Sequence, residues 1–148
     1  MNEKETYNLL EFILKRLEGI EFKWRLDGSV NLLVQGIDLN PNDLDIATTD
    51  NGLEVFFAHF NEFVVAGESG KFEGRILILD IDGKEIEINY YQDSDLQMMN
   101  KIELIEWRGL QLPILPLKEA KKFYEKIERK EKVKILTESL KISRERDK

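Results

Sequence analysis

The sequence predicts an α+β fold in which a β-sheet packs against helices. Residues 75–81 and 84–91 flank Asp82-Gly83, a dipeptide typical of two-residue β-hairpins, and residues 85–90 alternate polar and apolar side chains. Apolar residues recur at helical spacing near both ends of the chain, over about 3–18 and 117–142. Short apolar segments bounded by turn residues lie between these ends, which indicates further strands.

The first half of the chain is expected to alternate helices with short strands. Gly19 stands where the C-cap of a first helix would be, and Phe22, Trp24 and Leu26 alternate as in a strand. In order, we expect a helix over 3–18, a strand over 21–26, a turn at 27–29, a short helix over 30–35, a strand over 43–48, a helix over 53–60, a strand over 63–66 and a polar, glycine-rich loop over 67–74.

The predicted hairpin fixes which side chains share a face. A two-residue turn at Asp82-Gly83 places Ile78 opposite Glu87. Ile86 and Ile88 then point into the core, while Glu87 lies on the half-polar face. The second half continues with a hairpin over 102–115 around Gly109, in which Pro113 indicates an edge position, and with helices over 117–128 and 131–142.

Length and composition are those of one globular domain. The chain has 148 residues, of which 42% are hydrophobic and 34% charged. We expect a single domain over 1–148, with its core at about 22–91 and a C-terminal hairpin and helices at about 101–143. The sequence has no cysteine and no apolar run of membrane-spanning length, so we expect a cytoplasmic protein without a membrane partner. Abundant Lys, Glu and Ile suit a thermophile.

The net charge of −7 is unevenly distributed. Residues 117–148 hold 12 basic and 7 acidic side chains, whereas residues 1–116 hold 10 basic and 22 acidic ones. The acidic body argues against nucleic acid as a partner, because non-specific binding relies on neutralising phosphates. The lysines at 118, 121 and 122 are either a solvated helical face or a set of cations that helps to hold a triphosphate.

Two short motifs suggest phosphate and metal chemistry. Gly28 lets the backbone approach a phosphate closely, and Ser29 opens a short helix whose N–H groups attract anions. Asp43 and Asp45 lie one residue apart on a predicted strand, so their carboxylates point the same way and can share Mg²⁺ or Mn²⁺. Glu87, on the polar face of a later strand, can complete such a site or accept a proton.

The order of these motifs resembles the signature of the nucleotidyltransferase superfamily, the polymerase-β-like fold. The likeness is greatest to its minimal single-domain prokaryotic members. It implies a mixed or antiparallel sheet packed against helices, with further helices at the C-terminus. It also implies that Gly28 and Ser29 hold a nucleoside triphosphate such as ATP, and that Asp43, Asp45 and Glu87 bind two divalent ions. Glu85 fits the third carboxylate less well. The implied activity transfers a nucleotidyl group to a hydroxyl acceptor and releases pyrophosphate.

Other interpretations stay open. The fold can serve as a non-catalytic binding or regulatory module, as in a toxin–antitoxin-like pair, or the acids can be surface charges of a plain α+β domain. Asn40-Pro41-Asn42 lacks the basic residue that many relatives place before the aspartates. The acceptor is a small molecule or a protein. The sequence leaves open which base is preferred and whether the protein is a monomer or an oligomer.

Overall fold

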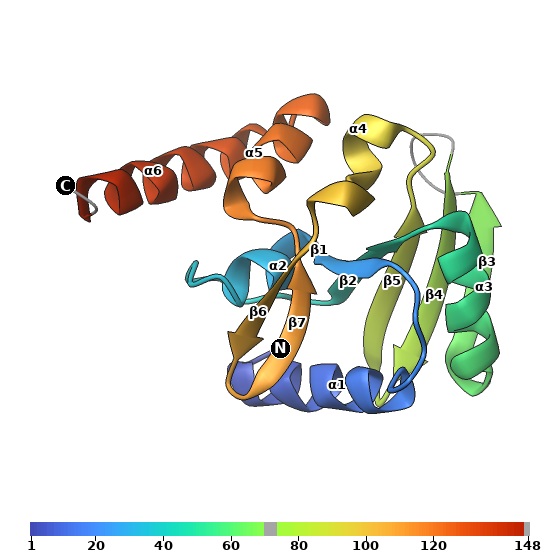
Figure 1. The fold of residues 1–148 in the computed structure, drawn as a ribbon. Helices are drawn as coiled ribbons and strands as arrows, with labels where there is room; N and C mark the ends of the chain where they lie inside the picture. Colours follow the sequence, from blue (N-terminus) through green and yellow to red (C-terminus); the bar gives the residue numbers. More distant parts are fainter. Residues whose placement is uncertain (70–73, 147–148) are drawn as a thin grey trace.

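The computed structural model describes residues 1–69 and 74–146 (Figure 1). Its main elements, in order, are α1 (Glu3–Arg16), β1 (Trp24–Asp27), α2 (Gly28–Leu33), β2 (Leu44–Thr48), α3 (Asp50–His59), β3 (Val64–Ser69), β4 (Arg75–Ile81), β5 (Lys84–Tyr90), α4 (Ser94–Gln97), β6 (Glu103–Trp107), β7 (Leu110–Ile114), α5 (Leu117–Lys126) and α6 (Lys130–Arg146). The predicted α+β class is confirmed.

Five strands form a mixed sheet in the order β1-β2-β5-β4-β3, and β6 and β7 form a separate antiparallel pair. Within the larger sheet only β2 and β5 run parallel, and the other neighbours are antiparallel. The β4–β5 hairpin has the register that the Asp82-Gly83 turn predicts, with Ile78 opposite Glu87. The parallel pairing of β2 with β5 therefore places the aspartate strand directly beside the glutamate strand.

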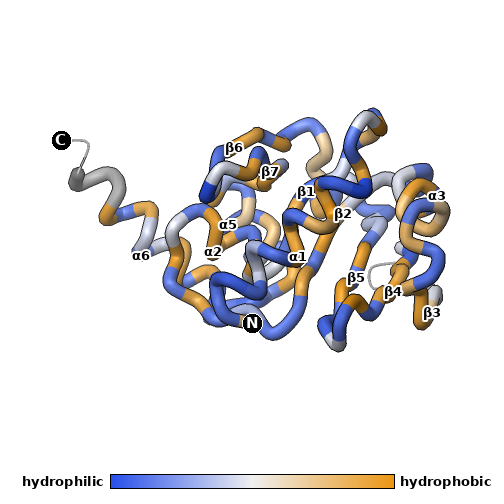
Figure 2. Tube along the Cα trace, turned by 90° about the horizontal axis from the view of Figure 1, so that it is seen from below, coloured by the Kyte–Doolittle hydropathy of each residue, from blue (hydrophilic) through white to orange (hydrophobic). Residues whose placement is uncertain are grey.

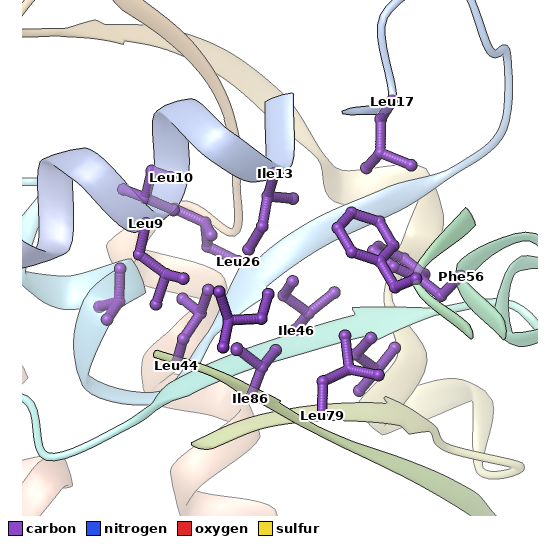
Figure 3. Packing of buried hydrophobic residues seen from close by; sticks show 14 of the residues in the cluster. Leu9, Leu10, Ile13, Leu17, Leu26, Leu44, Ile46, Phe56, Leu79 and Ile86 are labelled. Atoms are coloured by element: carbon purple, nitrogen blue, oxygen red, sulfur yellow. The ribbon is translucent and has the colours of Figure 1, made fainter. Parts of the chain in front are cut away.

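One face of this sheet is the main hydrophobic core. Buried apolar side chains of β1, β2, β4 and β5 point to α1 and α3, as Figure 3 shows for Leu26, Leu44 and Ile86 beneath the leucines of α1. The capping box of Asn2 and Glu5 starts α1, because each side chain accepts a hydrogen bond from the backbone N–H of the other. Burial of these apolar residues commits the alternate residues of each strand to the opposite face.

The opposite face of the sheet carries the polar residues and is covered in part by the C-terminal helices. Figure 1 shows α1 and α5 on opposite sides of the central strands. A second apolar cluster joins this face to α4, α5 and α6, and includes Ala47, Leu96, Phe123 and Leu136. α6 extends away from the body of the molecule in Figure 1, and Figure 2 shows the same from below for the coloured part of this helix. The start of α6, by contrast, lies over the polar face.

Several boundaries differ from the sequence prediction, and α2, for example, starts at Gly28, inside the expected turn. β1 starts later, at Trp24, and continues to Asp27, because Asp27 pairs with Asp45 across the sheet. β2 starts at Leu44, so Asp43 lies in the preceding loop. β3 extends to Ser69, which shortens the predicted glycine-rich loop, and residues 70–73 of that loop lie outside the described residues. No helix within 1–69 and 74–146 combines the length and apolarity of a membrane span.

Candidate functional site

Strand register brings three carboxylates into one row across the polar face. Asp27 of β1 pairs with Asp45 of β2, and Asp45 pairs with Glu87 of β5. All three line a cavity of about 400 Å³, together with Asp43 from the loop before β2 and with the Gly-Ser turn. The structure therefore brings together every residue that the sequence proposes for the site: Gly28, Ser29, Asp43, Asp45 and Glu87.

Glycine is required at position 28 because the backbone there lies very close to the side chain of Asp45. Its φ is +59°, a conformation that side-chain-bearing residues rarely adopt. A Cβ atom at this position would stand 2.3 Å from Oδ2 of Asp45. The backbone of the turn thus touches the aspartate strand, so the position of Gly28 and the position of the Asp45 carboxylate depend on each other.

Asp45 is mostly buried and lies close to three other carboxylates, those of Asp27, Asp43 and Glu87. Burial is the main reason that its pKa rises to about 8, and the neighbouring charges of Asp27 and Asp43 and a hydrogen bond with Glu87 act in the same direction. The ordinary pKa of an aspartate is 3.8. Asp45 is therefore largely protonated at neutral pH in the protein alone, and a cation placed beside it would favour the ionised form.

Asp27 belongs to a buried polar network beneath the site. Arg25 is fully buried and donates to Oδ1 of Asp27 at 3.2 Å, while the Tyr91 hydroxyl donates to Oδ2 at 2.5 Å. Arg25 also donates to the carbonyl oxygens of Leu26, Leu96 and Gln97. Burial, with the charge of Asp27 beside it, raises the pKa of Tyr91 well above its ordinary value, so this phenol stays protonated and remains a donor.

The start of α6 and the residue just before it supply the cations of the site. Lys132 of α6 donates from Nζ to the Ser29 hydroxyl at 3.1 Å, and Arg129 lines the same cavity. Burial and the charge of Arg129 lower the pKa of Lys132. Lys122, by contrast, is exposed and pairs with Glu119 on the outside of α5. Lys118, Lys121 and Lys122 do not line the cavity, so a solvated helical face is the better interpretation of these three.

Aromatic side chains form one wall of the cavity. Phe123 and Tyr124 of α5 line it, and Phe123 packs edge-on against Tyr91 with ring centroids 5.4 Å apart. Burial raises the pKa of Tyr124, and the charges of Asp27 and Asp45 add to this effect. Sequence reasoning missed the other lining residues, among them the charged or phenolic Asp27, Tyr91, Tyr124, Arg129 and Lys132. Only Asp27 carried a local signal, because it directly precedes the Gly-Ser turn.

The acidic cavity is the best-supported site among the described residues. A larger hollow of about 640 Å³ lies beside α3, but its one carboxylate, Glu54, already pairs with Arg75 at 3.1 Å. In the described part of the chain, no three acidic, histidine or cysteine side chains already stand at the spacing of metal ligands. The carboxylates of the smaller cavity line it together, and their side chains would have to turn toward one point to bind an ion.

The fold resembles those of several solved proteins. A protein from Thermotoga maritima, TM1012, which its description assigns provisionally to the nucleotidyltransferases, is 28% identical, with a TM-score of 0.73 and with 95% of this chain and 96% of that chain covered. The enzyme ANT(2″)-Ia, solved with adenylyl-2″-tobramycin, is 9% identical at a TM-score of 0.63, covering 92% and 90% of the two chains. The lincosamide antibiotic adenylyltransferase LnuA, solved with lincomycin, is 14% identical at a TM-score of 0.60, covering 93% and 97%.

The structural neighbours confirm the nucleotidyltransferase-like fold that the motif order implies. A search of curated proteins finds no significant match. The family described as aminoglycoside-2″-adenylyltransferase matches residues 9–140, which include every residue of the cavity described above. The chain therefore belongs to the aminoglycoside-2″-adenylyltransferase family.

Proposed function

We propose that the protein is a divalent-cation-dependent nucleotidyltransferase that transfers the nucleotidyl group of a nucleoside triphosphate to a hydroxyl acceptor. The observation that carries the proposal is the row of Asp27, Asp45 and Glu87 across three strands, next to a glycine turn and a half-buried lysine. The cavity is lined by carboxylates and by basic side chains, and this combination suits a substrate that brings both cations and phosphates. Family membership makes ATP the first nucleotide to test.

The triphosphate is expected to bind between the Gly-Ser turn and α6. Backbone N–H groups at Gly28 and Ser29 can donate to phosphate oxygens. Lys132 already reaches the Ser29 hydroxyl, so its ammonium lies where a phosphate held by that turn would be. Arg129 lines the same cavity and adds a second positive charge, which it shares with Glu131 through a hydrogen bond of 3.0 Å from its Nε. These two side chains provide the positive charge that the loop before Asp43 lacks.

The carboxylates fit hard divalent cations. Asp43, Asp45 and Glu87 offer only oxygen donors, the ligands that Mg²⁺ and Mn²⁺ prefer. Burial is the largest cause of the raised pKa of Asp45, and the carboxylates of Asp27, Asp43 and Glu87 add to it, so a cation bound beside Asp45 would favour its ionised form. Two bound ions would stabilise the negative charge that develops on the attacking and leaving oxygens. We propose Asp43, Asp45 and Glu87 as their ligands.

Side chains of the cavity would assist each part of the nucleotidyl transfer. The acceptor hydroxyl oxygen forms a bond to the α-phosphorus, the bond from the α-phosphorus to the bridging oxygen of the β-phosphate breaks, and pyrophosphate leaves. Glu87 accepts the proton of the hydroxyl, directly or through water. Lys132 and Arg129 hold the leaving phosphates, and the aromatic wall of Phe123 and Tyr124 shields one side of the cavity from water.

The experiment measures pyrophosphate release and transfer of label from α-labelled ATP in the presence of Mg²⁺. The acceptor panel starts with aminoglycosides, which the family description names, and continues with lincosamides, other hydroxylated small molecules and proteins. We expect an acceptor-dependent product that disappears in Asp45→Asn. Exposed Asp38 provides the control variant, Asp38→Asn, which should retain activity. Unchanged product formation in Asp45→Asn would contradict the proposed site.

A further inference from the structure

Asp27 faces the same cavity as the proposed cation ligands, yet both of its oxygens already have donors. Oδ1 accepts from Arg25 at 3.2 Å and Oδ2 accepts from the Tyr91 hydroxyl at 2.5 Å. The residue is only 5% exposed. A carboxylate buried in this way is held in one orientation, because turning it would leave a buried guanidinium and a buried hydroxyl without this acceptor.

The groups that hold Asp27 are themselves fixed by distant parts of the chain. Arg25 donates to the carbonyl oxygens of Leu96 and Gln97 at the end of α4, and its guanidinium lies 5.9 Å from the ring centre of Phe123 in α5. Tyr91 follows β5, the strand that carries Glu87, and packs against Phe123. Asp27 therefore joins β1, the end of β5 and the C-terminal helices at one point.

This junction is directly connected to the proposed cation ligand Asp45. Asp27 pairs with Asp45 across β1 and β2, and it precedes Gly28, the residue whose backbone approaches the Asp45 carboxylate too closely for any Cβ. A shift of Asp27 would therefore move the turn that the Asp45 carboxylate packs against. Replacing a residue that orients a metal ligand without binding the metal typically lowers metal affinity 10- to 100-fold.

We propose that Asp27 is a positioning residue of the cation site, held by Arg25 and Tyr91, which fixes Gly28 against Asp45 without binding the cation itself. This inference rests on the proposed function, because it presumes a cation at Asp45. It assigns to the Arg25–Asp27–Tyr91 network a role that a purely structural ion pair would not have: the network sets the affinity of the site for divalent cations.

The test is the dissociation constant of Mn²⁺ alone, measured by electron paramagnetic resonance on the folded full-length protein. Tyr91→Phe removes the hydrogen bond to Oδ2 and keeps the Asp27 charge, and we expect binding to weaken several-fold. Asp27→Asn removes the charge, and we expect binding to weaken by about 10- to 100-fold. Tyr7→Phe is the matched control, because its hydroxyl donates to Glu11 on α1, away from the cavity.

The outcomes separate this inference from the proposed function. If Asp27→Asn weakens Mn²⁺ binding while Tyr91→Phe leaves it unchanged or tightens it, Asp27 is a direct ligand and the inference is wrong. If both variants lose only thermal stability and bind Mn²⁺ as the original protein does, the network is merely structural. Should Asp27→Asn not fold, Tyr91→Phe decides. Wild-type protein that binds no Mn²⁺, or Asp45→Asn that binds it equally well, would overturn the proposed function together with the inference.

Discussion

Replacing Asp45 with asparagine should stabilise the protein in the absence of divalent cations, although it should abolish the proposed activity. The pKa of Asp45 is about 8 in the folded protein, against an ordinary value of 3.8, and burial is the largest cause. At neutral pH this side chain must therefore take up a proton when the chain folds. An asparagine side chain would fill the same space and would need no proton. Asp45 is therefore expected to lower the free energy of unfolding when no cation is bound.

The size of the effect follows from proton linkage. A pKa of about 8 against 3.8 corresponds to about 5 kcal/mol at pH 7.5, as an upper limit. Coupling to Asp27, Asp43 and Glu87 spreads this cost, and asparagine still buries a polar amide, so we expect the free energy of unfolding to rise by about 1–3 kcal/mol. Folding raises the pKa of Asp45, so wild-type protein has its full stability below pH 3.8, where Asp45 is protonated in both states. The free energy of unfolding then falls as the pH rises from 3.8 to about 8.

The assay is urea unfolding in EDTA at several pH values between 5.5 and 8. The variant should become progressively more stable than wild type as pH rises, by up to about 1.4 kcal/mol per pH unit. Asp38→Asn, at an exposed loop position, should show no such trend. Adding Mg²⁺ should stabilise wild type selectively and narrow the difference. A difference that is independent of pH, or an Asp45→Asn variant less stable than wild type at pH 7.5, would refute this reasoning.

Two further predictions concern the turn and the helix that face Asp45. Gly28→Ala should lower the free energy of unfolding by about 1–3 kcal/mol and remove activity, because its Cβ would meet Oδ2 of Asp45 at 2.3 Å; unfolding curves and the transfer assay measure both effects. Gly36→Ala is the control, since its φ is also positive, at +98°, but its Cβ would meet no atom within 4 Å, and equal losses in both variants would contradict the argument. Lys132→Met should raise the KM for the triphosphate about 10-fold, because it removes a charge-assisted contact to phosphate; steady-state kinetics measure this change. Exposed Lys134→Met on the same helix should leave KM unchanged, and a Lys132→Met enzyme with normal KM would remove Lys132 from the proposed phosphate site.

The sequence predicted the local parts of the site well, because alternation within a strand is a local property. Ile86 and Ile88 are fully buried, which leaves Glu87 on the other face as the hairpin register predicts. That Asp45 stands beside Glu87 depends on the parallel pairing of β2 with β5, which nothing in either segment specifies. The family resemblance implied this neighbourhood, and the structure shows it.

The missed residues depend on contacts between distant segments. Lys132 and Ser29 are 103 residues apart, so no short motif connects them. Asp27 was assigned to the turn, and its place at the end of β1 follows only from its pairing with Asp45. Tyr91 is 64 residues from Asp27 and resembles an ordinary strand-end aromatic residue in the sequence. These residues come together only when the sheet has formed and α5 and α6 have packed against it.

The proposed function requires that Asp43, Asp45 and Glu87 hold divalent cations beside a triphosphate that is bound by the Gly-Ser turn and Lys132. The most direct measurement is anomalous diffraction from a crystal soaked with Mn²⁺ and a non-hydrolysable ATP analogue. We predict Mn²⁺ peaks among the three carboxylates and triphosphate density between Ser29 and Lys132. Triphosphate density elsewhere, or a crystal whose cavity contains neither Mn²⁺ nor phosphate at saturating concentrations of both, would contradict this claim.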